Sequence, residues 1–205
     1  MRGLTRQAKT LTDTQVRALL RFVETETTYA DRNRVIVLLS FKAGLRAKEI
    51  AGLTWGMLTD TEGRLADAMA LANVATKGQS GRVIPLHPEL KGALERLHRH
   101  HIASRERHLS GDAFVIQFKK GASESVTRSN SVQFLFKDWF SRLGFSGASS
   151  HSGRRTFITK AARRVSEVGA SLRDVQMLAG HSSIQVTQRY VDCDPEAQRK
   201  LIDRL

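Results

Sequence analysis

His181 and Tyr190 are the two residues near the end of the chain whose types suit chemistry, and they stand nine positions apart in LAGHSSIQVTQRYVD. A phenol has a pKa of about 10, so it becomes a nucleophile only when a base or nearby cations help to remove its proton. One straight helix would rise about 13 Å between the two residues and point their side chains in opposite directions. A corner between two helices, with Gly180 ending the first and Ser182 or Ser183 capping the second, would bring the rings together. We interpret this corner as a candidate active site; the alternative is an ordinary half-buried tyrosine and a loop histidine.

Residues 149–157, SSHSGRRTF, combine groups that suit an anion. Serines can cap a helix here, and His151 and Arg154, three residues apart, would share a face of its first turn. Helix N-terminal amides, an arginine fork and an imidazole together can hold a phosphate, and Gly153 would let that ligand approach the backbone. Arg155 lies about 100° farther round the helix, so we expect it to bind a separate phosphate or a carboxylate within the protein.

Two further cations could serve the same anion. Arg46 follows a glycine that is expected to end a helix, and Glu49 lies three residues later, where a carboxylate can hold a guanidinium in place. The alternative is an ordinary surface ion pair. Lys77 lies in a glycine-bearing turn between two short strand candidates, residues 70–75 and 82–86. A lysine at a hairpin tip is often only a solvated charge, but a flexible hairpin can also lower an ammonium onto a bound ligand.

A histidine cluster, formed by His98, His100, His101 and His108, ends another expected helix. Arginines are interleaved with these histidines, which disfavours a metal site because cations repel a metal ion. We interpret the cluster as a solvated basic face that could touch phosphates.

Helices are the main elements expected to position these residues. Their boundaries are predicted from capping-box patterns, a proline and glycines: Thr12 with Gln15 for the first, about Asp31 to Gly44 for the second, Pro88 for the start of the third, and Ser171 with Asp174 to Gly180 for a later one. Apolar spacing gives the first helix a buried face of Val16, Leu19, Leu20 and Val23.

The strongest helical pattern precedes the anion-binding segment and ends at Gly144. Its apolar positions are Val132, Leu135, Phe136, Trp139, Phe140 and Leu143. We assign this face to the core, because its aromatic residues do not alternate with basic ones as a base-stacking surface would require. Residues 113–118 could form a short strand, and residues 119–130 are expected to form a loop. These patterns predict an α+β fold that is mainly α, with a small antiparallel β-hairpin.

Composition narrows the class of partner. The chain has 205 residues, enough for one domain or a domain with a small appendage, and 33 Lys and Arg against 20 Asp and Glu give it a net charge of +13. Such a charge favours a polyanion, with nucleic acid ahead of an anionic membrane. We expect no membrane span and no secretory signal, because no apolar run is long enough. The only cysteine, Cys193, cannot form an internal disulfide, which favours a reducing cytoplasm.

Four motifs, in chain order, carry a resemblance to a known family: GLRAKEIAGLTW, TKGQSGRVIPL, HSGRRTFITKAA and LAGHSSIQVTQRY. Each is weak alone, but four in this order and at these intervals resemble the tyrosine recombinase, or phage-type integrase, family. The resemblance implies its catalytic-domain fold for residues 11–193, after a basic arm formed by residues 1–10. It also implies a helical tail, residues 194–205, that docks on a neighbouring protomer. The chain is similar in length to short single-domain members.

The resemblance implies that the reaction acts on a scissile DNA phosphate. Tyr190 would attack this phosphate and form a 3′-phosphotyrosyl bond. Arg46 and Arg154 would hold the non-bridging oxygens, and His181 would donate a further hydrogen bond to them. No metal, ATP or other cofactor is implied.

Proton transfer and DNA contacts would fall to other residues. By the same resemblance, Lys77 would protonate the departing 5′-oxygen, His151 would assist proton transfer at the tyrosine, and Glu49 would orient the first arginine. Further contacts to DNA are predicted for Lys42, Arg155, Lys119 and Lys120.

The expected partner is double-stranded DNA, bound by a homo-oligomer that forms a tetrameric synapse; a monomer in solution is compatible with this. We expect a site-specific recombinase that performs integration, excision or inversion in the cytoplasm. The alternatives are a non-catalytic DNA-binding accessory protein with the same fold and a nicking-closing enzyme that resembles type IB topoisomerases. The intact set of six catalytic residue types disfavours the accessory protein.

Overall fold

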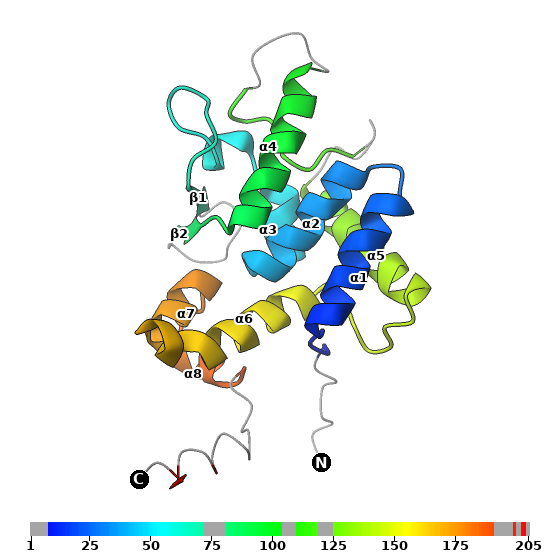
Figure 1. Cartoon of the computed structure of the whole chain (residues 1–205). Helices are drawn as coiled ribbons and strands as arrows, with labels where there is room; N and C mark the ends of the chain where they lie inside the picture. Colours follow the sequence, from blue (N-terminus) through cyan, green and yellow to red (C-terminus); the bar gives the residue numbers. More distant parts are fainter. Residues whose placement is uncertain are drawn as a thin grey trace. The chain divides into compact units, whose positions relative to one another are not determined.

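The computed structural model describes residues 8–71, 81–103, 110–118, 125–190, 199, 202 and 203, with only the backbone of residues 125–128. The chain divides into two compact units, Met1–Phe157 and Ile158–Leu205. Figure 1 labels the helices and strands of both units. In the described part of the chain, no helix is both long enough and apolar enough to cross a membrane.

Helix α2 lies at the centre of the first unit, packed against α1 on one side and α4 on the other (Figure 1). Helix α3 packs against α5 and, over a smaller area, against α2. The bounds of these helices are Asp13–Thr25 for α1, Ala30–Lys42 for α2, Ala47–Gly52 for α3, Pro88–Ala103 for α4 and Ser125–Arg142 for α5. Five consecutive residues of α2, from 35 to 39, are fully buried, as a helix covered on both sides requires.

The predicted start signal of α1 and the predicted end signal of α2 are confirmed. The Thr12 side chain accepts from the Gln15 amide and the Gln15 side chain accepts from the Thr12 amide, so the capping box at the start of α1 is complete. All four residues of the predicted apolar face of α1 are buried. Gly44, two residues after α2, has a φ of 67°, the left-handed conformation that ends a helix.

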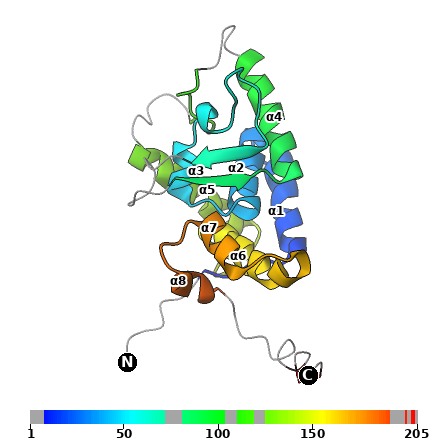
Figure 2. The ribbon, with the colours of Figure 1, turned by 90° about the vertical axis from the view of Figure 1, so that its left-hand side faces the viewer.

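The predicted hairpin is present as two antiparallel strands, β1 (Ala68–Leu71) and β2 (Arg82–Pro85), drawn as a pair of arrows in Figure 2. Their register pairs Leu71 with Arg82 and Ala68 with Pro85. Strand β1 begins two residues earlier than predicted. The turn that carries Lys77 lies outside the described residues.

Two predictions on either side of residue 120 were wrong. The expected strand at residues 113–118 is reduced to one bridge between Thr54 and Phe114. Among the described residues, backbone hydrogen bonds join this segment only to the chain around Thr54, so no longer strand forms there. The expected loop up to residue 130 is helical from Ser125, since α5 begins there. Serine, threonine and asparagine lower helix propensity by only a fraction of a kcal/mol each, which the packing of the following apolar face overcomes.

Four of the six residues predicted for the core face of α5 are buried, whereas Leu135 and Leu143 are half-buried. The apolar face of α5 buries Val132, Phe136, Trp139 and Phe140, each at most 2% exposed. The ring centroids of Phe136 and Trp139 lie 5.5 Å apart in an edge-on arrangement, as expected for aromatic residues within a core.

The second unit holds the C-terminal part of α6 (Ser152–Arg164), the 3-10 helix η3 (Val165–Val168), α7 (Leu172–Ala179) and α8 (Ile184–Gln188). The predicted capping box at the start of α7 is confirmed, because Asp174 accepts from the amide and hydroxyl of Ser171. Gly180 ends α7 with a φ of 61°, and Ser183 precedes α8 in an extended conformation. The predicted last helix and Cys193 lie almost entirely outside the described residues.

Candidate active site

A buried carboxylate organises the predicted site residues of the first unit. Glu49, in the first turn of α3, accepts the Arg46 backbone amide on Oε2 at 2.8 Å and Arg46 Nη1 on Oε1 at 3.1 Å. The predicted pairing of these two residues is confirmed. It is not an ordinary surface ion pair, because the Glu49 side chain is only 2% exposed, whereas that of Arg46 is 39% exposed.

A second arginine, which sequence reasoning missed, binds the same carboxylate. Arg82, the first residue of β2, places Nη1 and Nη2 at 3.0 Å from the two oxygens of Glu49, a bidentate pairing. The alternation of inward- and outward-facing residues along this strand was the one signal that Arg82 points inward. Residues two apart share a face, so Arg82 lies on the side of buried Ile84, whereas Val83 is 65% exposed.

The third arginine of this group comes from the start of α6. Arg154 is 4% exposed, and its Nη1 donates to the carbonyl oxygen of Gly44 at 2.7 Å. Burial by itself would raise the pKa of Glu49, but the hydrogen bonds and charge of Arg82, the Arg46 amide and the charge of Arg154 together hold this pKa below its usual value. Two guanidinium groups therefore bind this carboxylate, and a third acts on it through its charge. We call Arg46, Glu49, Arg82 and Arg154 the arginine cluster.

Close helix packing places Arg154 in this cluster. A Cβ atom at Gly153 would overlap the Ser40 hydroxyl and lie 2.8 Å from the Ser40 Cβ. The prediction that Gly153 admits a ligand to the backbone was wrong, because its bare Cα faces α2. Its small size lets the start of α6 approach α2 closely.

The remaining predicted residues of the first unit lie in different settings. His151 is exposed and directly precedes α6, where its amide donates to Ser149 Oγ at 3.3 Å. It therefore differs from buried Arg154, with which it was expected to share a face. Lys42 pairs with Glu89 at 3.6 Å, and Arg155 is half-buried. Three predicted lysines lie outside the described residues, namely Lys77, Lys119 and Lys120.

The predicted site residues of the second unit lie at the corner between α7 and α8. The rings of His181 and Tyr190 are stacked, with centroids 5.4 Å apart and planes at 24°. The predicted corner is thereby confirmed. Thr187 is fully buried, and its hydroxyl lies 2.9 Å from His181 Nδ1, while Gln176 Nε2 donates to the His181 carbonyl at 2.9 Å. Sequence reasoning missed Thr187, whose only signal was its place one turn before Tyr190.

The phage integrase family matches residues 9–197, which is most of the chain and contains the arginine cluster as well as His181 and Tyr190. The chain belongs to the phage integrase family. Among its relatives, tyrosine recombinase XerD of Neisseria meningitidis serogroup B is 30% identical over 184 residues, covering 88% of this chain and 57% of that protein. The chain thus spans little more than half the length of the curated relatives that it matches.

Solved structures share the fold of this chain. The Tn1549 transposon integrase in complex with a circular intermediate DNA has a TM-score of 0.72 at 23% identity, covering all of this chain and 68% of that one. The catalytic domain of bacteriophage HP1 integrase has a TM-score of 0.61 at 18% identity, covering 96% of this chain and 95% of that one.

Two members of the histidine cluster, His98 and His101, are part of the packing of the first unit, and His108 lies outside the described residues. Trp55 Nε1 donates to Nδ1 of buried His101 at 3.3 Å, and the rings of Trp55 and His98 lie 4.6 Å apart. Burial lowers the pKa of His98. The prediction of a solvated basic face was therefore wrong for these two histidines, because both pack against Trp55. His100 is exposed, as predicted. Within the described ranges, no three histidine, cysteine or acidic residues gather as a metal site would require.

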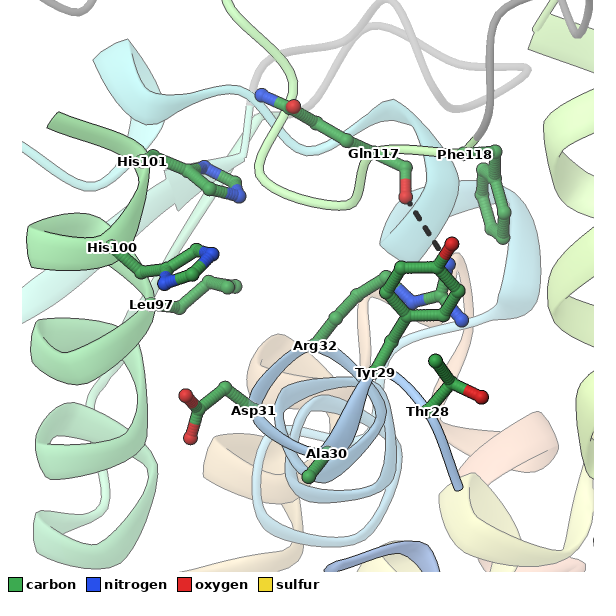
Figure 3. A pocket seen from close by; sticks show the side chains of 10 residues that line it. All are labelled: Thr28, Tyr29, Ala30, Asp31, Arg32, Leu97, His100, His101, Gln117 and Phe118. Atoms are coloured by element: carbon green, nitrogen blue, oxygen red, sulfur yellow. Dashed lines mark hydrogen bonds between the residues drawn. The ribbon is translucent and has the colours of Figure 1, made fainter. Parts of the chain in front are cut away.

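A pocket of about 460 Å³ lies at the other end of α2 from Gly44 and contains none of the predicted catalytic residues (Figure 3). Arg32 crosses it, with its guanidinium 4.4 Å from the centroid of the Tyr29 ring and 5.3 Å from that of Phe118. Its Nη1 donates to the Gln117 carbonyl at 3.3 Å, drawn as a dashed line in Figure 3. Arg32 thus ties the start of α2 to residues 117–118, which is a structural role.

Proposed function

We propose that this integrase-family chain is a site-specific DNA recombinase that breaks and rejoins strands through a 3′-phosphotyrosyl intermediate. The observation that carries the proposal is the arginine cluster. In it, one carboxylate holds half-exposed Arg46 by a hydrogen bond and interacts with the charge of buried Arg154. Family membership supports the proposal, as does the name tyrosine recombinase of its relatives, since a tyrosine stacked on a histidine is present here.

The arginine cluster suits a phosphodiester because its charge is unbalanced. Three guanidinium groups and one carboxylate sum to +2, and one phosphodiester would reduce this to +1. Arginine stays charged at any working pH and matches phosphoryl oxygens with paired donors. In the proposed reaction, Arg46 and Arg154 bind the non-bridging oxygens, whose charge grows as the bond to the nucleophile forms.

The proposed chemical step exchanges one phosphoester bond for another. The Tyr190 hydroxyl oxygen attacks phosphorus, and the bond from phosphorus to the 5′-oxygen breaks. His151 assists removal of the phenol proton, and Lys77 protonates the departing 5′-oxygen. The energy of the broken ester is kept in the phosphotyrosine, so that a 5′-hydroxyl of another strand can reverse the step.

The hydrogen bond between Thr187 and His181 supports a particular tautomer in this proposal. With the Thr187 hydroxyl donating to Nδ1, the ring hydrogen resides on Nε2. His181 Nε2 then donates to a non-bridging phosphate oxygen. Thr187 would thus orient His181 without touching DNA.

We also propose the assembly implied by the family. Residues 11–193 would act as the catalytic domain within a tetramer on double-stranded DNA, in the cytoplasm. The tail at residues 194–205 would dock on a neighbouring protomer. Further DNA contacts would come from Lys42, Arg155, Lys119 and Lys120.

A nicked duplex tests the proposed function. Cleavage close to the nick releases a short fragment with a free 5′-hydroxyl, and once this fragment has diffused away the strand cannot be rejoined, so the covalent product accumulates. Duplexes tiled from the DNA that flanks the gene provide candidate sites. We expect a covalent protein–DNA adduct with the wild-type protein and none with Tyr190→Phe. An adduct of equal yield with Tyr190→Phe, or no adduct on any duplex, would contradict the proposal. Relaxation of supercoiled DNA without joining of two duplexes would instead indicate a nicking-closing enzyme.

A further inference from the structure

The members of the arginine cluster differ sharply in exposure. The Arg46 side chain is 39% exposed, whereas those of Glu49 and Arg82 are 2% and 9% exposed. Arg46 and Arg82 bind the same carboxylate, yet an anion arriving from solvent has far better access to Arg46. The two arginines therefore have different functions in this cluster.

Glu49 uses its full capacity as a hydrogen-bond acceptor. Oε1 accepts from Nη1 of Arg46 and Nη1 of Arg82, and Oε2 accepts from the Arg46 amide and Nη2 of Arg82. A carboxylate offers about four acceptor sites, so both oxygens are satisfied. Arg82 supplies two of the four donors and is nearly as buried as Glu49 itself.

We propose that Arg82 is a positioning residue for Arg46: it fixes both oxygens of Glu49, so that Glu49 holds Arg46 with its guanidinium toward the bound phosphate. This inference rests on the proposed function. Arg82 itself does not contact DNA.

Loss of Arg82 would change the cluster in two ways. Glu49 would keep only the donors of Arg46, so the carboxylate would be free to turn and to draw the Arg46 guanidinium inward, away from the phosphate. Burial would also raise the pKa of Glu49, because two hydrogen bonds and one adjacent charge that now oppose this effect would be missing. Protonated Glu49 would hold Arg46 less firmly.

The test compares Arg82→Gln and Arg82→Lys with the control Arg64→Gln, which removes a 70% exposed arginine paired with surface carboxylates. At saturating nicked duplex, we expect Arg82→Gln to slow single-turnover cleavage by about ten- to a hundredfold, the range for a hydrogen bond to a charged group. DNA affinity should change less than about threefold, and cleavage should fall further as the pH is lowered. Arg82→Lys should recover part of the rate, and Arg64→Gln should leave it unchanged.

A double variant separates positioning of Arg46 from a simple loss of stability. Once Glu49→Gln has removed the charge that Arg82 fixes, adding Arg82→Gln should cost little further cleavage rate. This double variant also removes both charges of a buried pair, which proteins often tolerate, so it remains informative should Arg82→Gln alone not fold. Independent losses that multiply in the double variant would overturn the proposal, as would wild-type cleavage by Arg82→Gln.

An NMR titration of the Glu49 side-chain carboxyl carbon, without DNA, distinguishes failure of this inference from failure of the proposed function. We expect Arg82→Gln to raise the pKa of Glu49 whether or not the protein cleaves DNA. A raised pKa with no cleavage by the wild type would contradict the proposed function while the cluster stands. An unchanged pKa in a protein that cleaves DNA would overturn only the inference about Arg82.

Discussion

Replacing Gly153 by alanine should force α6 away from α2 and thereby disturb Arg154. The added methyl group would overlap the Ser40 hydroxyl, lie 2.8 Å from the Ser40 Cβ and lie 2.9 Å from Phe41 Cδ2. Carbon atoms prefer a separation of roughly 3.5–4.0 Å, so the two helices would have to part by about 1 Å. This overlap falls on the side chains of Ser40 and Phe41, which are both buried and have little room to move.

The expected magnitude follows from overpacking in a core, which typically costs about 1–3 kcal/mol. Alanine recovers up to about 1 kcal/mol through its higher helix propensity, and less at a helix start. We therefore expect a net loss of about 1–2 kcal/mol. For a chain of this length, each kcal/mol lowers the melting temperature by about 2–4 °C, so a decrease of several degrees should be measurable by circular dichroism.

Gly52→Ala is the matched control for this experiment, because no atom lies within 4 Å of its new Cβ. It should change the free energy of unfolding by less than about 0.5 kcal/mol and so leave the melting temperature nearly unchanged. Adding Ser40→Gly to Gly153→Ala should restore part of the loss, since it removes the nearest overlapping atoms. Equal melting temperatures for Gly153→Ala and Gly52→Ala would refute the reasoning that Gly153 is required by helix packing.

Three other predictions concern the arginine cluster, the corner between α7 and α8, and the histidine cluster. Arg154→Ala should slow single-turnover cleavage by about 10²–10³-fold, as loss of an oxyanion-hole donor does, while gel-shift affinity for DNA falls only severalfold. Thr187→Val should slow cleavage about fivefold, because His181 would lose the hydrogen bond that orients it; an unchanged rate would argue against that role. Because burial lowers the pKa of His98, its neutral form stabilises the fold above pH of about 6.5, and this stability is lost as the pH falls below that value. Denaturant unfolding at several pH values should show a weaker acid destabilisation for His98→Gln, and an identical slope would contradict this prediction.

Local signals in the sequence were sufficient for the helix ends that carry a capping box or a left-handed glycine, and for the corner that carries the tyrosine. Capping boxes act between residues three apart, and Gly180 needs only its own left-handed backbone, so both can be predicted without the fold. The Arg46–Glu49 pair is predictable for the same reason, since both residues lie in one helical turn.

Features that depend on distant partners were not predictable from the sequence. Arg82 is 33 residues from Glu49, and nothing in the spacing of the chain indicates that they meet. The role of Gly153 depends on Ser40, and the burial of His101 depends on Trp55, so each needs the tertiary structure. Whether such a side chain can contact a ligand or is part of the core depends on its packing partners, and not on its residue type alone.

The central claim, that arginines offset the charge of a phosphodiester attacked by Tyr190, is tested most directly with a modified nicked duplex. Its scissile phosphate carries a methyl group in place of one charged non-bridging oxygen, so the group to be cleaved is neutral. Cleavage by Arg154→Ala should be far faster on this duplex than on the natural one, and Tyr190→Phe should cleave neither. If Arg154→Ala were equally slow on both duplexes, or if Tyr190→Phe formed the adduct, the account would be contradicted.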